Sequence, residues 1–105
     1  MPHNNDNVTI IQLQQAADLL KAMGHPVRLC ILKRLADYGV ANVQQLQHCL
    51  SVPQSTVSQH LAVLRNTGII QGQRQGLEIH YRIIHPQVPA LIQQLQLSMN
   101  DPSSP

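Results

Sequence analysis

Apolar positions near the start of the chain follow the spacing of amphipathic helices. The first set recurs at i, i+3, i+7 and i+10 and predicts a helix that ends near Gly24; its members are Ile10, Leu13, Ala17 and Leu20. A second helix is expected from Pro26 to about Tyr38. Proline suits the first turn of a helix, where its missing N–H costs nothing, and Gly39 suits the end.

Two further helices are expected over residues 43–50 and 54–67, with a tight break at 51–53 between them. The second of them has an apolar face that should point inward, formed by Val57, Leu61 and Leu64. Gly68 stands where a left-handed residue is needed to stop that helix. A short helix, a tight turn and a second helix form the helix-turn-helix pattern.

Beyond Gly68 the periodicity changes from helical to alternating. Residues 69–74 are expected to form one strand, Gln75-Gly76 a turn, and residues 77–83 a second strand. The apolar members of the second strand alternate with polar neighbours; they are Leu77, Ile79, Tyr81 and Ile83. Pro86 is expected to open a last helix, whose apolar positions are Val88, Leu91, Leu95 and Met99.

The predicted order of elements is ααααββα, a mainly α (α+β) winged helix-turn-helix. At 105 residues the chain is about one small domain. We expect a flexible N-terminus over 1–9, one folded domain over 10–99 and a flexible tail over 100–105. A chain of this size buries a modest fraction of its surface, so a core shared with a second copy would stabilise it. The amphipathic first and last helices are candidates for that pairing.

Basic residues are concentrated in the centre of the chain. All seven Lys and Arg lie between positions 21 and 82, where only Asp37 and Glu78 oppose them, although the net charge of the chain is +2. A basic centre suggests a polyanionic partner. We find no apolar run that could span a membrane, no secretion signal and too few cysteines for a secreted disulfide scaffold. The chain is therefore expected to be a reduced, cytoplasmic protein.

The outward face of the predicted helix at 54–67 has the chemistry of a surface that reads DNA bases. It carries short hydroxyl and amide side chains where a solvated face more often carries Glu and Lys; they are Gln54, Ser55, Thr56, Ser58 and Gln59. A helix fits the major groove of DNA, where Gln pairs bidentately with adenine and Ser or Thr contacts several bases. The alternative is a polar helix that contacts only water.

The basic hairpin that follows is expected to act as a wing beside this helix. Arg74 and Arg82 are expected to contact phosphates, or Arg74 to enter a minor groove, and Gln75 serves the same wing. Arg65 is a further candidate for a phosphate contact. His60 is expected either to contact phosphate or to pack beside the recognition face.

Three segments in this order resemble ArsR-type winged-helix repressors, and among them the PagR-like members. The similar segments are the helix opening at 20–29 (LKAMGHPVRL), the recognition helix at 53–61 (PQSTVSQHL) and the wing at 74–83 (RQGLEIHYRI). The resemblance covers about residues 16–95. It implies a homodimeric transcriptional repressor that binds palindromic double-stranded operator DNA near its own promoter. It also implies a dimer interface built from the first and last helices.

The resemblance locates the positions where metal-sensing members of the family hold their ligands. The thiolate site before the recognition helix corresponds here to Asn42, Val43 and Gln44. The second site falls on or near His85, Gln87, Ser98 and Asp101. Two possible ligands of four do not make a closed tetrahedral site, and the six histidines are spread along the chain without ligand spacing. We expect no metal, no other cofactor and no obligatory small-molecule ligand.

Two alternatives to a ligand-free repressor remain open. Cys30 is expected to share a helical face with Lys33 and Arg34, two cations that would favour its thiolate and make it a candidate for redox sensing. A winged helix can also serve as a protein–protein interaction module. An enzyme is not expected, because the chain has no Gly-rich phosphate loop, nucleophile elbow or metal-ligand motif.

Overall fold

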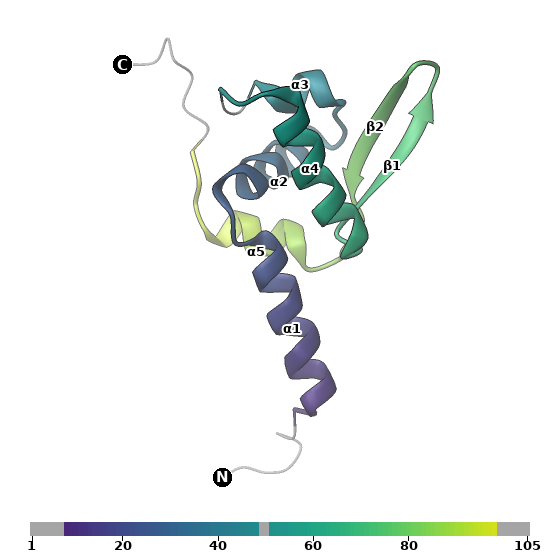
Figure 1. Ribbon diagram of the computed structural model, residues 1–105. Coiled ribbons are helices and arrows are strands. Elements are labelled where there is room, and N and C mark those ends of the chain that lie inside the picture. The colour runs from purple at the N-terminus through teal and green to yellow at the C-terminus, as the bar shows by residue number, and fades with distance from the viewer. Residues whose placement is uncertain (1–7, 49–50, 99–105) are drawn as a thin grey trace.

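The computed structural model describes residues 8–48 and 51–98. Within these residues the chain forms a winged helix-turn-helix in the predicted order of elements (Figure 1). The elements are α1 (Ile10–Met23), α2 (Pro26–Tyr38), α3 (Val43–Gln47), α4 (Gln54–Asn66), β1 (Ile70–Gln75), β2 (Glu78–Ile83) and α5 (Val88–Gln94).

Local sequence signals account for where the helices begin. Thr9 and Gln12 form a capping box at the start of α1, and Asn42 with Gln45 forms another at the start of α3. Pro26 stands in the first turn of α2, as predicted. Each capping box satisfies backbone N–H groups that have no partner inside the helix.

The hydrophobic core lies where α2 meets α4, the hairpin and α5. Its most enclosed side chains are aliphatic and less than 2% exposed; they are Ile31, Leu32, Leu35, Leu46, Val57, Leu61, Leu64, Ile69, Ile70, Val88 and Ile92. Tyr81 is the aromatic member of the core. This core holds α4 in place from behind, so that its other face is free to contact a partner.

The wing is an antiparallel hairpin in which Ile70 pairs with Ile83 and Gln75 with Glu78. Ala41, just before α3, exchanges backbone hydrogen bonds with Tyr81 at 3.1 and 2.8 Å. Because that bridge joins the loop before α3 to β2, the hairpin is attached directly to the helix-turn-helix.

The structure corrects the boundaries of the hairpin. β1 extends through Gln75, and the two-residue turn is Gly76-Leu77 rather than Gln75-Gly76. Gly76 has a φ of 66°, which suits glycine at the first central position of a type II′ turn. Leu77, predicted to belong to the second strand, is therefore at the tip of the wing and 99% exposed.

The last helix is shorter than predicted. It starts at Val88 after an N-cap at Gln87, not at Pro86, and it ends at Gln94. The chain turns away at Gln96, whose φ of 53° is left-handed. Leu95 lies beyond the helix and is 52% exposed. The helical spacing of apolar residues in the sequence therefore extends further than the helix and the core that covers it.

Smaller differences concern the other helix ends. α3 ends at Gln47 and α4 at Asn66, compared with predicted ends at 50 and 67. Thr9, predicted to lie in the flexible N-terminus, caps α1. The predictions for Met99 and for the rest of the two tails lie outside the described residues, as do those for 49–50.

Candidate nucleic-acid interface

The two helices of the helix-turn-helix are fixed to each other by packing and by one side-chain bond. The Gln47 amide donates to the Val52 carbonyl at 3.1 Å, which ties the end of α3 to the segment before α4. Leu46 is buried at the core and anchors the short helix. Pro53 precedes α4 with an extended backbone, and no side chain caps the helix.

The α4 helix has one apolar face and one polar face. Val57, Leu61 and Leu64 are buried, as their spacing predicted. Four of the five predicted base-reading residues are exposed and the fifth, Thr56, is half-buried; the exposed four are Gln54, Ser55, Ser58 and Gln59. The amide and hydroxyl groups of these side chains therefore form one accessible surface, which we call the recognition face.

The basic residues of the wing are exposed on the hairpin. Arg74 and Gln75 lie next to the turn, and Arg82 lies nearer the base. The Arg82 guanidinium donates to the Gln73 amide oxygen at 3.0 Å across the two strands. Arg65, in the last turn of α4, is also exposed. Figure 1 shows the hairpin projecting beside α4.

A polar contact that the sequence did not reveal joins the wing to the helix-turn-helix. The Asn42 amide donates to the Glu78 carboxylate at 3.3 Å, and His80 lies 3.1 Å from the same carboxylate oxygen. A hollow of about 320 Å³ lies between these groups and the recognition face; among the residues that line it are Asn42, Gln44, Gln54, Ser58 and Leu77. The recognition face and the tip of the wing therefore border one continuous concave surface.

His60 differs from the other predicted contact residues, because it is half-buried and faces α2. Its Nδ1 lies 3.0 Å from the Arg28 guanidinium, and its ring lies 4.3 Å from that of His25. Of the two expectations for His60, this arrangement matches packing beside the recognition face. Sequence reasoning missed Arg28, since one arginine on an amphipathic helix carries no signal of its partner.

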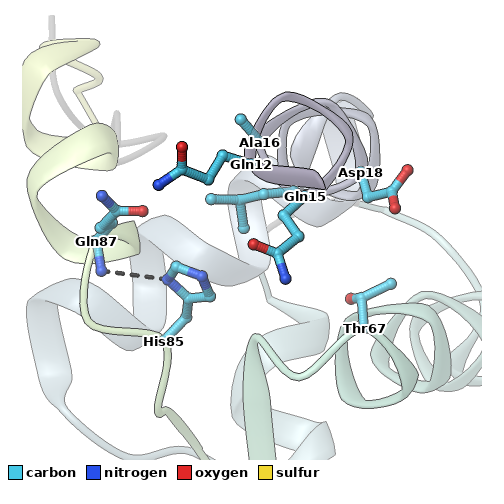
Figure 2. Close-up of a pocket in the computed structure, with 8 residues that line it drawn as sticks. Gln12, Gln15, Ala16, Asp18, Thr67, His85 and Gln87 are labelled. Carbon is cyan, nitrogen blue, oxygen red and sulfur yellow. Dashed lines mark hydrogen bonds between the residues drawn. The ribbon is translucent and has the colours of Figure 1, made fainter. Parts of the chain in front are cut away.

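A second hollow of about 670 Å³ lies between α1, the end of α4 and the start of α5 (Figure 2). It includes His85 and Gln87, the positions that the family resemblance compares with metal ligands. The backbone N–H of Gln87 donates to Nδ1 of His85 at 3.2 Å, so this ring nitrogen already has a hydrogen-bond partner. Within residues 8–48 and 51–98, no group of three or more His, Cys, Asp or Glu side chains could hold a metal ion.

The redox candidate Cys30 is half-buried on α2. The cations expected beside it have other contacts: the Lys33 ammonium lies 3.0 Å from Asp37, and the Arg34 guanidinium lies 5.6 Å from the centre of the Tyr38 ring. The second cysteine, Cys49, falls outside the described residues. In the part of the chain that the structure describes, no helix is long and apolar enough to cross a membrane.

Known proteins are similar to this chain in sequence. The family model described as "Bacterial regulatory protein, arsR family" matches residues 25–71. The transcriptional repressor PagR of Bacillus anthracis is 43% identical over 88 residues, which cover 84% of this chain and 88% of that protein. The regulator YgaV of Escherichia coli is 41% identical over 83 residues, which cover 79% and 84%.

Solved structures show the same relationship. The crystal structure of PagR superposes with a TM-score of 0.75 at 44% identity, covering 83% of this chain and 99% of that chain. HlyU from Vibrio cholerae superposes with a TM-score of 0.78 at 34% identity, covering 84% and 95%.

Proposed function

The chain belongs to the ArsR family of DNA-binding transcriptional repressors, which are not enzymes, and from this premise we propose that it acts as a homodimer on a palindromic operator. Its own promoter is the first operator to test. The repressor works without a metal, another cofactor or an obligatory small-molecule ligand.

The observation that carries this proposal is the exposed recognition face beside a basic wing. Hydroxyl and amide side chains lie along one side of α4, and the apolar side chains of the opposite side are buried in the core. In our proposal Gln54, Ser55, Thr56, Ser58 and Gln59 contact bases or nearby phosphates in the major groove. Arg65, Arg74, Gln75 and Arg82 contact the DNA backbone and set the register of the protein on the duplex.

The dimer is supported by the apolar surface of α1. Three members of its predicted apolar stripe are more than half exposed, namely Ile10 at 79%, Leu13 at 53% and Leu20 at 58%. Figure 1 shows α1 projecting from the body of the domain beside α5. Pairing of these helices about a two-fold axis would cover the stripe and would place two α4 helices about 34 Å apart, one turn of DNA.

The proposal of a metal-free repressor rests on the ligand set in the described residues. Asn42, Val43 and Gln44 supply no thiolate, and an amide is a poor ligand for the soft metals that thiolates select. This proposal would be wrong if Zn²⁺ or Cd²⁺ at micromolar concentration released the purified dimer from DNA.

The dimer is tested by sedimentation of the full chain and a matched pair of variants. Leu13→Glu places a charge in the exposed stripe and is expected to give a monomer. Gln15→Glu adds the same charge about 200° around the helix from Leu13 and is expected to leave the dimer intact. Equal behaviour of the two variants would reject α1 as the interface.

Operator binding is tested by footprinting the dimer on the DNA upstream of its own gene, with and without peroxide. A protected palindrome that is insensitive to peroxide is the expected result. Weak binding that has no sequence preference and disappears with salt would favour a protein–protein module instead. Release by peroxide that Cys30→Ser abolishes would favour the redox alternative.

A further inference from the structure

Arg28 connects three parts of the fold with one side chain. Its Nε donates to the carbonyl of Ala22, in the last turn of α1, and its Nη1 lies 3.0 Å from Nδ1 of His60 on α4. The residue itself is on α2 and half-buried. One planar guanidinium therefore ties the proposed dimerisation helix to the recognition helix, with both bonds fixed by its rigid geometry.

The chemistry of this contact defines the protonation state of His60. Arginine stays charged and can only donate, so Nδ1 of His60 must be the acceptor, and the neutral ring carries its proton on Nε2. The ring of His60 also packs on that of His25, with ring centres 4.3 Å apart. His25 is held in turn, because its own Nδ1 accepts the Val27 N–H at 3.1 Å and caps α2.

A proton on Nδ1 of His60 would break this arrangement. The acceptor would become a donor and a cation facing the Arg28 guanidinium, with His25 alongside. Every carboxylate in the described residues is engaged elsewhere: Asp18 with Gln14, Asp37 with Lys33, and Glu78 with His80 and Asn42. The pKa of His60 is lowered by burial first, then by His25 and Arg28, which agrees with a ring held neutral.

We propose that Arg28 and His60 are positioning residues that hold the recognition helix at the angle required by the operator, and that protonation of His60 releases this hold and weakens operator binding. The inference rests on the proposed function, because it explains how α4 is oriented rather than whether it contacts DNA. His60 then acts through α4 and touches no base.

The proposed role and a direct contact to phosphate predict opposite effects of acid on operator affinity. A histidine that touches phosphate binds DNA more tightly when it gains a positive charge. A histidine that must stay neutral to accept from Arg28 weakens operator binding on protonation. Non-specific binding depends on total positive charge rather than on the angle of α4, so it should not weaken on acidification.

The test uses the full-length dimer and a duplex selected by the wild type from a random library. Its affinity is measured between about pH 8 and about pH 5.5, across the range where histidine titrates. Wild type is expected to lose roughly tenfold in operator affinity on acidification, which corresponds to about 1.4 kcal/mol. Its affinity for an unrelated duplex of equal length should stay constant or rise.

Two substitutions at position 60 separate positioning from a merely structural role. His60→Asn places an amide oxygen close to the position of Nδ1, so it can accept from Arg28 and cannot be protonated. It is expected to rescue operator binding near pH 8 and to flatten the pH profile. His60→Leu has no acceptor and is expected to lose roughly tenfold near pH 8 on the operator alone. Circular dichroism confirms that each variant is folded before binding is measured.

A matched control replaces a histidine outside this cluster. His48 is exposed at the end of α3, and His48→Asn is expected to keep the wild-type pH profile. The inference is overturned if His60→Asn keeps that profile as well, or if acid tightens operator binding of the wild type. Failure of the wild type to select any sequence at pH 8 would instead reject the proposed function.

Discussion

Arg74 and Arg82, the two arginines of the wing, lie on opposite faces of the hairpin. Arg74 pairs with Ile79 and Arg82 pairs with Gln71 across the two strands. Side chains alternate between faces along a strand, and positions 79 and 82 are an odd number of residues apart. A wing that lies between the two backbones of a DNA groove could therefore present one arginine to each side.

This placement predicts that the two arginines act independently. Arg74→Ala and Arg82→Ala should each weaken binding to every duplex by a similar factor, and each should reduce the slope of log K against log salt by about 1. The double variant should show the sum of the two effects, because distant contacts add. Titrations at several salt concentrations measure both quantities. A double variant no weaker than either single variant would show that the arginines share one contact.

The recognition face predicts a different result for Gln59→Ala. A glutamine that pairs bidentately with one base contributes about 1–3 kcal/mol of discrimination at that base pair. We expect this variant to bind the preferred duplex more weakly and to lose preference at a single position, while its salt slope stays unchanged. Competition with a set of singly substituted duplexes measures this. Gln15→Ala, which removes an exposed amide on the side of α1 away from the apolar stripe, serves as the control and should match the wild type.

The backbone plan of the domain was readable from periodicity, because the buried positions repeat with the period of each element. Val57, Leu61 and Leu64 recur at helical spacing, and all three are buried. Tyr81 alternates with polar neighbours, and it is buried as well. The order of the elements and the hairpin after the helix-turn-helix were also predicted from these patterns, and the structure and its superposition on PagR confirm both.

The sequence-based predictions that were wrong or incomplete concern features that the local hydrophobic pattern does not determine. The apolar spacing continues through Leu95, but the helix ends before it, because no part of the described core covers that position. The hairpin turn shifted by one residue, since Gly76 suits either turn position by its conformational freedom. The Arg28–His60 contact joins residues 32 positions apart, and no local pattern encodes such a pair.

Gly72 provides a prediction about the stability of the wing. It pairs with Tyr81, and a Cβ added there would lie 2.9 Å from Cγ2 of Ile79 and 3.0 Å from Cε1 of Tyr81. Tyr81 is a core residue and cannot move freely. Gly72→Ala should therefore destabilise the fold by about 1–3 kcal/mol, as overpacking does. Urea unfolding measures the change, with Gln71→Ala on the outer face as the control. A wild-type midpoint for Gly72→Ala would show that the hairpin can shift at no cost.

The lowered pKa of His60 gives a prediction for stability against pH that is separate from DNA binding. Below the ordinary value of 6.5 the unfolded chain takes up the proton more readily than the folded one. The stability that neutral His60 contributes to the fold is therefore fully present above the ordinary pKa. This stability is lost as the pH falls from about 7 through the pKa that His60 has in the folded state. Urea unfolding of wild type and His60→Asn at about pH 7.5 and about pH 5.5 measures this loss. Both are measured at one protein concentration, because the proposed pairing of two copies would make stability concentration-dependent. Wild type should lose more stability between the two pH values than His60→Asn, because only the wild type has a group at position 60 that can be protonated. An equal loss would mean that His60 is as easily protonated in the fold as in the unfolded chain, and its bond to Arg28 would then carry no preference for the neutral ring.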